Sequence, residues 1–183
     1  MILFDCFNGR PEKLQLPSGC AIESYSIQPK NDFFNIKTSA QLHYYVSNYP
    51  SSKGGGLAWN LQCLVLSTKE FFQISRRKNA NHILINGNLN HYMLQWKYRI
   101  GCDYAIYILS VANLVLGQWI AKSFGGYKFV MDGHILAELD EPNEAGTWGT
   151  ITIHPEGRGK SSLLVICAFM IAYRNLHSSS KVH

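Results

Sequence analysis

From Cys20 onward the chain consists of short runs in which apolar and polar residues alternate, separated by Gly, Asn, Asp and Ser. A period of two places one face of a strand in a core and the other in solvent, so this pattern predicts a mainly β protein. The predicted strands cover residues 20–27, 33–36, 41–47, 59–66, 70–76, 82–85, 91–99, 104–109, 114–121, 127–131, 134–139 and 147–154.

Turn-forming residues mark the joints between these runs. Asn86-Gly87 and Asp132-Gly133 each follow an apolar run, and both dipeptides tolerate the positive φ of tight hairpins. Residues 104–121 contain no charge, but Ser110, Asn113 and Gln118 interrupt them, so the centre of this stretch is predicted to be a turn between two buried strands. The longest loop is expected at residues 48–56, which hold one Pro and three consecutive Gly.

The segment 161–173 (SSLLVICAFMIAY) breaks the alternation because it is apolar on every side. A helix of this kind must be wrapped by protein or by lipid. Its run of about a dozen apolar residues is shorter than the roughly 20 that cross a bilayer. Ser161 is predicted to be its N-cap.

Two packed sheets would leave this helix exposed, whereas a closed barrel would enclose it and would also remove the sheet edges. We therefore expect a closed antiparallel β-barrel of about twelve strands around a hydrophobic C-terminal α-helix. The domain boundaries follow: an irregular lead-in at 1–19, a barrel domain at 20–176 with its central helix at 161–175, and a flexible tail at 177–183.

The composition indicates a protein from a reducing compartment that carries a mild positive charge. The five cysteines are scattered and form no C-x-x-C pair, which disfavours a disulfide framework and a zinc knuckle. No secretory signal is recognisable, and an intracellular, cytoplasmic location is expected. The formal net charge of +5 permits contact with an anionic surface without requiring it.

The candidate binding residues are basic and lie at the ends of two predicted strands. They are Arg76, Arg77, Lys78, Lys97 and Arg99. Alternate residues of a strand share a face, so Lys97 and Arg99 are expected to project together. Such side chains could hold a phosphorylated headgroup, although charges at strand ends also serve simply to protect sheet edges.

The sequence gives little support for a metal site, an active site or a nucleic-acid-binding surface. The histidines form no H-x-x-x-H or H-E-x-x-H pattern, so no metal is expected. No nucleophile–base set is visible, so we expect a non-enzymatic protein without catalytic residues or cofactors. Asp140, Glu141 and Glu144 lack the spacing of a calcium loop. Nucleic-acid binding is not expected, because the tryptophans are spread over separate strands.

The C-terminal third resembles the tubby C-terminal-like superfamily, which comprises tubby domains, phospholipid scramblases and LURP-one-related proteins. The resemblance rests on the hairpin at 126–133 (GYKFVMDG), the strand at 134–139 (HILAEL), the stretch 147–157 that leads into the helix, and the helix itself. Residues 64–77 add a strand–turn–strand unit that ends in basic residues. The resemblance implies a closed antiparallel barrel around a hydrophobic helix.

The same resemblance implies a role at membranes. The phosphoinositide-binding Lys/Arg pair of tubby domains has no counterpart that can be placed here. The acidic residues 140–144 lie one strand too early for the calcium-linked segment of scramblases, so the LURP-one-related branch is the closer match. The expected function is a binding or tethering module for anionic phospholipid headgroups, peripheral to a membrane. The alternatives are a scramblase-like transporter with a membrane-inserted helix and a protein-interaction barrel without a ligand.

Overall fold

The structure is a computed structural model that describes residues 22–49, 56–101, 104–142 and 145–179. The predicted lead-in and most of the predicted loop at 48–56 lie outside these residues. The described elements are twelve strands, a 3-10 helix and an α-helix: β1 (Glu23–Pro29), β2 (Phe33–Lys37), β3 (Leu42–Asn48), β4 (Leu57–Val65), β5 (Phe71–Arg77), β6 (His82–Asn86), β7 (His91–Tyr98), β8 (Ala105–Val111), β9 (Leu114–Ala121), β10 (Tyr127–Met131), β11 (His134–Asp140), β12 (Thr150–Ile153), η1 (Pro155–Lys160) and α1 (Ser161–Ser179).

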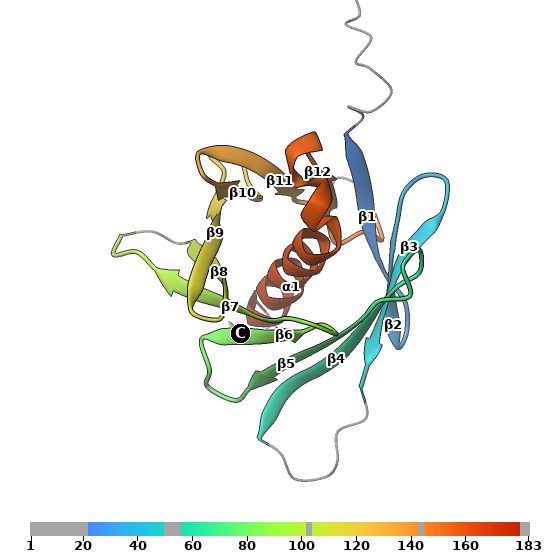
Figure 1. The fold of residues 1–183 in the computed structure, drawn as a ribbon, viewed down its shortest axis with the longest axis horizontal. Coiled ribbons are helices and arrows are strands. Elements are labelled where there is room, and N and C mark those ends of the chain that lie inside the picture. Colours follow the sequence, from blue (N-terminus) through green and yellow to red (C-terminus); the bar gives the residue numbers. More distant parts are fainter. Residues whose placement is uncertain (1–21, 50–55, 102–103, 143–144, 180–183) are drawn as a thin grey trace, which may run out of the picture.

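The strands form one closed antiparallel barrel in which each strand pairs with its neighbours in sequence. The ring closes where β1 pairs with β12, with Ser26 opposite Thr150 and Glu23 opposite Ile153. Figure 1 shows α1 enclosed by this ring. The predicted fold class, including the number of strands and the central helix, is confirmed.

The core is the space between the helix and the inner face of the barrel. Residues Leu163–Ala172 are all buried, as expected for a helix that is apolar on every side. The strands contribute the alternate residues that point inward, such as Ile74 on β5 and Phe129 on β10. Their polar neighbours face outward, which explains why alternation identified the strands.

The helix starts at Ser161 as predicted, but the role of this serine and the last residue of the helix differ from the prediction. Ser161 is not an N-cap: its backbone is already helical, and its hydroxyl donates to the carbonyl of Arg158, 2.8 Å away. The 3-10 helix η1 leads directly into α1, so the extended N-cap position falls on His154, before η1, rather than on Ser161. At the other end α1 continues to Ser179 rather than Asn175. Here His177 stacks on Tyr173 with ring centroids 4.1 Å apart, which extends the packed part of the helix.

The turns follow the local sequence signals in part. Asp132 and Gly133 have φ of 50° and 80°, as the predicted tight hairpin requires. Ala112 and Asn113 also have positive φ, and they form the predicted turn within the uncharged stretch. Asn86-Gly87 behaves differently, because Gly87 opens a wider loop in which its amide donates to the carbonyl of Asn90.

The topology gives the barrel two distinguishable ends. Strand direction alternates around the ring, so the turns that follow odd-numbered strands share one end. The even-numbered β12 finishes at the other end, where α1 begins, and α1 then runs back through the barrel. Contacts of Tyr173 with Trp59 and of Arg174 with Tyr98 confirm this path. We call the end where α1 finishes the mouth, and the end where it starts the base.

Within the described residues, no helix combines the length and the hydropathy needed to cross a membrane. Cys63 and Cys167 are free and buried in the core. Burial raises the pKa of the Cys63 thiol to about 12 and raises that of Cys167 as well, so both stay protonated. The other three cysteines lie outside the described residues.

Candidate functional site

The five basic residues singled out from the sequence all lie at the mouth, but they face different ways. Arg76 points inward at the end of β5, in register with Trp59 of β4, and is partly buried. Arg77, Lys78 and Lys97 are exposed. Arg99 is exposed too, but β7 ends at Tyr98, so the predicted shared face of Lys97 and Arg99 is not provided by strand alternation. The five therefore form an exposed group of four and one inward arginine.

The inward residue Arg76 belongs to an arginine–aromatic cluster. Its guanidinium carbon lies 4.6 Å from the ring centroid of Trp59 and 5.0 Å from that of Trp96. Its Nε donates to the carbonyl of Ala80 at 3.1 Å. Stacking of this kind contributes roughly 0.5–2 kcal/mol per contact and fixes the planar group in place.

A second arginine, Arg174 on the last turns of α1, completes the cluster. Only 8% of it is exposed, and its guanidinium carbon lies 4.4 Å from the same Trp96 ring. It donates from Nη1 to the hydroxyl of Tyr107 at 2.9 Å and from Nη2 to that of Tyr98 at 2.6 Å. Tyr107 in turn donates to Asn175. The cluster thus ties the end of the helix to β4, β5, β7 and β8.

No carboxylate of the described residues forms an ion pair with either arginine of the cluster. Burial lowers the pKa of Arg76, and the nearby positive charge of Arg174 lowers it further. For Arg174, burial acts to lower the pKa, but Tyr107 and Tyr98 outweigh it and the pKa is raised. Among the described residues, the two guanidinium groups at the mouth contact aromatic rings, hydroxyls and a backbone carbonyl, and Arg174 also lies near the negative C-terminal end of the helix dipole.

Charge is distributed unequally between the two ends among the described residues. At the base, acids and bases match: Lys37, Lys69, Arg158 and Lys160 against Glu23, Glu70, Asp132 and Glu156. At the mouth, bases prevail: Lys30, Arg76, Arg77, Lys78, Lys97, Arg99, Lys122 and Arg174 against Asp32, Asp140 and Glu141. The mouth is therefore the electropositive end.

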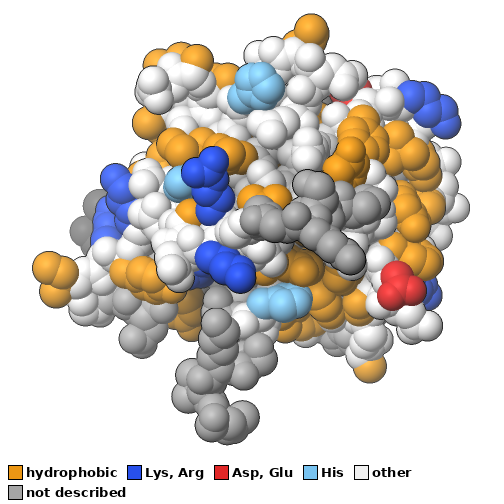
Figure 2. All heavy atoms as spheres, turned by 90° about the horizontal axis from the view of Figure 1, so that it is seen from below, with side chains coloured by type: hydrophobic (Ala, Val, Ile, Leu, Met, Phe, Trp, Pro, Cys, Tyr) orange, Lys and Arg blue, Asp and Glu red, His pale blue; other side chains and the backbone are white. Residues whose placement is uncertain are grey.

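Hydrophobic side chains stand uncovered among these bases. Ile100 after β7 and Phe124 after β9 are fully exposed at the tips of mouth turns. Tyr98 and Tyr104 flank the first of these tips and are more than half exposed. On the underside of the barrel as drawn in Figure 1, blue Lys and Arg side chains lie among orange hydrophobic ones at the left and centre of the view (Figure 2).

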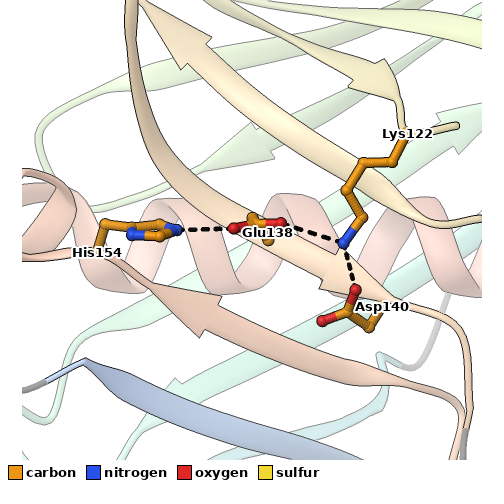
Figure 3. Close-up of polar contacts among 4 residues, drawn as sticks. All are labelled: Lys122, Glu138, Asp140 and His154. Atoms are coloured by element: carbon orange, nitrogen blue, oxygen red, sulfur yellow. Dashed lines mark hydrogen bonds and ion pairs between the residues drawn. The ribbon is translucent and has the colours of Figure 1, made fainter. Parts of the chain in front are cut away.

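A separate polar network lies on the outer wall (Figure 3). Lys122 donates to Glu138 at 3.1 Å and also to Asp140, while Nε2 of His154 lies 2.9 Å from the other oxygen of Glu138. Glu138 and Asp140 alternate with the buried Ala137 and Leu139 on β11, which turns both carboxylates outward. The network therefore links the ends of β9, β11 and β12 across the wall.

The network shifts the ionisation of its members in opposite directions. Burial acts to raise the pKa of Glu138, but hydrogen bonds with His154 and Lys122 outweigh it, so the pKa lies below the ordinary value of 4.5. Burial acts to lower the pKa of Lys122, but hydrogen bonds to Asp140 and Glu138 outweigh it, so the pKa lies above the ordinary value of 10.5. Both shifts favour the charged forms, which indicates a stabilising role.

We expect Glu138→Gln to lower the free energy of unfolding by about 0.5–1 kcal/mol at neutral pH, the upper range for partly exposed ion pairs. Because the folded pKa of Glu138 is depressed, its contribution is complete above 4.5 and is lost as the pH falls through the folded value. The difference in denaturant midpoint between the variant and the parent should therefore become smaller as the pH falls below 4.5. Glu156→Gln, which changes an exposed carboxylate outside the network, is the control. If the difference in denaturant midpoint between Glu138→Gln and the parent did not depend on pH, the stabilisation would not come from the charge of Glu138.

Sequence reasoning did not identify Arg174 or the wall network. The signal for Arg174 was its place directly after an apolar run, where a charged residue on a buried helix needs a partner. Among the described residues, no three His, Cys, Asp or Glu side chains come together as a metal site.

Fold and site together define a class: a closed antiparallel barrel filled by its own helix α1, with an electropositive mouth that contains an arginine–aromatic cluster. None of the family models, curated proteins or solved structures compared with the chain matches it.

Proposed function

We propose that this protein is a non-enzymatic tethering module whose mouth binds anionic phospholipid headgroups at a membrane surface. The proposal is carried by exposed hydrophobic tips that lie at the same end of the barrel as basic residues without an ion-pair partner among the described residues. Ile100 and Phe124 are fully exposed there, and Lys97 and Arg99 come just before the first tip in sequence. Apolar tips can enter the headgroup layer while basic residues attract anionic lipid.

The cluster supports the same proposal from inside the mouth. Arg76 offers guanidinium hydrogens beyond the one bonded to Ala80, and guanidinium groups suit the paired oxygens of phosphate. Stacking on Trp59 and Trp96 holds the group in one orientation before any ligand arrives. Kinship with the tubby C-terminal-like superfamily and a cytoplasmic, membrane-peripheral location are part of the proposal.

The scramblase-like alternative requires α1 to enter the bilayer. In the structure α1 fills the barrel, so insertion would empty the core and expose the inner faces of the strands. The tethering proposal needs no such rearrangement. The interaction barrel without a ligand remains the competing prediction, in which the exposed tips would contact a protein.

The test is vesicle flotation of the full chain with phosphatidylcholine alone and with a minor fraction of phosphatidylinositol bisphosphate. We expect binding only to the anionic vesicles. The double variant Lys97→Gln/Arg99→Gln should weaken it by about 30-fold, because each basic residue near an anionic surface contributes about 1 kcal/mol.

Matched controls come from the base of the barrel. Lys69→Gln/Lys160→Gln removes the same charge from exposed residues at that end and should leave binding unchanged. Ile100→Ser/Phe124→Ser should weaken binding at unchanged charge, whereas Leu89→Ser, an exposed leucine of the base, should not. Equal losses for mouth and base variants, or equal flotation with neutral vesicles, would overturn the proposal. Vesicles that carry the same total charge in the form of phosphatidylserine provide a further comparison. Equal binding to both kinds of anionic vesicle would indicate general electrostatic attraction, and tighter binding to phosphatidylinositol bisphosphate would indicate recognition of its headgroup.

A further inference from the structure

A cavity of about 200 Å³ opens at the mouth, between the last turns of α1 and the wall formed by β10 and β11. Pockets for drug-sized ligands measure roughly 300–1,000 Å³, so this one suits a group of only a few heavy atoms. Apolar surface dominates its lining, to which Leu139, Ala172 and Leu176 contribute. The exposed bases that carry the proposed function are not among its lining residues.

Three aromatic residues from separate segments line this cavity: Tyr104 before β8, Tyr127 on β10 and Trp148 before β12. Two of them are fixed by their neighbours. The ring of Tyr127 meets that of Tyr107 edge-on, with centroids 5.4 Å apart. The ring of Trp148 packs on that of Phe34, with centroids 4.6 Å apart. The third, Tyr104, is more than half exposed.

Two carboxylates accompany the rings, Asp140 and Glu141. Asp140 is paired with Lys122 on the outer wall. Glu141 forms no ion pair with any described residue, although its carboxyl carbon lies so close to Gly125 that a β-carbon there would come within 3.0 Å of it. A carboxylate with no ion-pair partner in the described part of the chain thus lies beside an aromatic, largely apolar cavity.

We propose that this cavity binds a small quaternary ammonium group such as that of choline. The faces of aromatic rings attract cations, and several rings with a carboxylate form the site that such ligands prefer. A trimethylammonium group also matches the apolar lining, because its charge is covered by methyl groups. Free choline and a phosphocholine headgroup share this chemistry.

The experiment titrates the full chain with choline chloride and follows the indole signal of Trp148 by NMR, with isothermal calorimetry in parallel. The decisive comparison is the neutral isostere in which carbon replaces the choline nitrogen. We expect choline to bind at least about ten-fold more tightly, since cation–π contacts contribute roughly 0.5–2 kcal/mol each. Equal affinity for the isostere would overturn the proposal, because the cavity would then recognise shape alone.

Variants test the residues. Tyr104→Leu and Glu141→Gln should each weaken choline binding several-fold. Tyr49→Leu and Asp32→Asn make comparable changes to residues of the mouth that do not line the cavity, and should not affect binding. Unchanged affinity in Tyr104→Leu would also count against the site. Tighter binding of phosphocholine than of choline would indicate that the natural ligand is a lipid headgroup rather than free choline. Soluble probes need no vesicle, so the result is independent of the proposed tethering function.

Discussion

Phe169→Ala is expected to lower the free energy of unfolding by about 3–5 kcal/mol, the range measured for large aromatic residues truncated in a core. Phe169 is completely buried at the centre of α1, with its ring 5.2 Å from that of Phe34 and 5.8 Å from that of Tyr173, centroid to centroid. Strands of a closed ring cannot move inward independently, so the vacated space should collapse poorly. The loss is a large share of the roughly 5–15 kcal/mol that stabilises a typical domain.

Denaturant unfolding followed by tryptophan fluorescence measures this loss, and thermal unfolding should show a fall in Tm of about 6–20 °C. Phe124→Ala is the matched control, because it removes the same atoms from a fully exposed ring. That variant should stay within about 0.5 kcal/mol of the parent. Similar small losses for both variants would mean that α1 is not the packed centre of the barrel.

Gly126→Ala is expected to destabilise the protein by about 2–5 kcal/mol. Gly126 has a φ of +76°, and a β-carbon there would lie 2.1 Å from the carbonyl oxygen of Leu139 on the neighbouring strand. The left-handed backbone costs an alanine about 1–2 kcal/mol, and forced displacement of packed neighbours adds roughly 1–3 kcal/mol. Backbone atoms cannot swing aside as a flexible side chain can.

Gly133→Ala separates these two contributions. Gly133 has a nearly identical φ of +80°, but no atom lies within 4 Å of its would-be β-carbon. We expect this control to lose only the conformational part, about 1–2 kcal/mol. If the two variants were equally destabilised in denaturant unfolding, the close approach between β10 and β11 at Gly126 would be disproved.

The strands were predictable because each one is marked by a local pattern, the alternation of apolar and polar residues. Alternation in β3 or β7 reports directly which side chains face the core, and every predicted strand overlaps an observed one. The apolar run of α1 then required enclosure, which only a closed ring provides. The helix ends were less predictable, since the packing of His177 on Tyr173 and the entry through η1 depend on tertiary contacts.

The site was predictable only in part for the same reason. Charge at the ends of β5 and β7 is visible in the sequence, and the topology brings those ends to the mouth. The stacking of Arg76 and Arg174 on one Trp96 ring joins residues that are far apart in the chain. Which residues meet in the cluster depends on the register between strands and on how far α1 extends along the barrel axis. Neither can be inferred from a short sequence motif.

The closing pair of strands also dictates the order of folding. Ser26 meets Thr150 across the seam between β1 and β12, so the ring cannot close until the chain has been made through β12. The helix that fills it comes later still in the sequence. If β1–β11 pair before then, they make a sheet with two open edges and an uncovered apolar face, and exposed edges and apolar surface favour aggregation. Pairing over such sequence distances is slow, so we expect this barrel to fold more slowly than a protein of similar size with mostly local contacts.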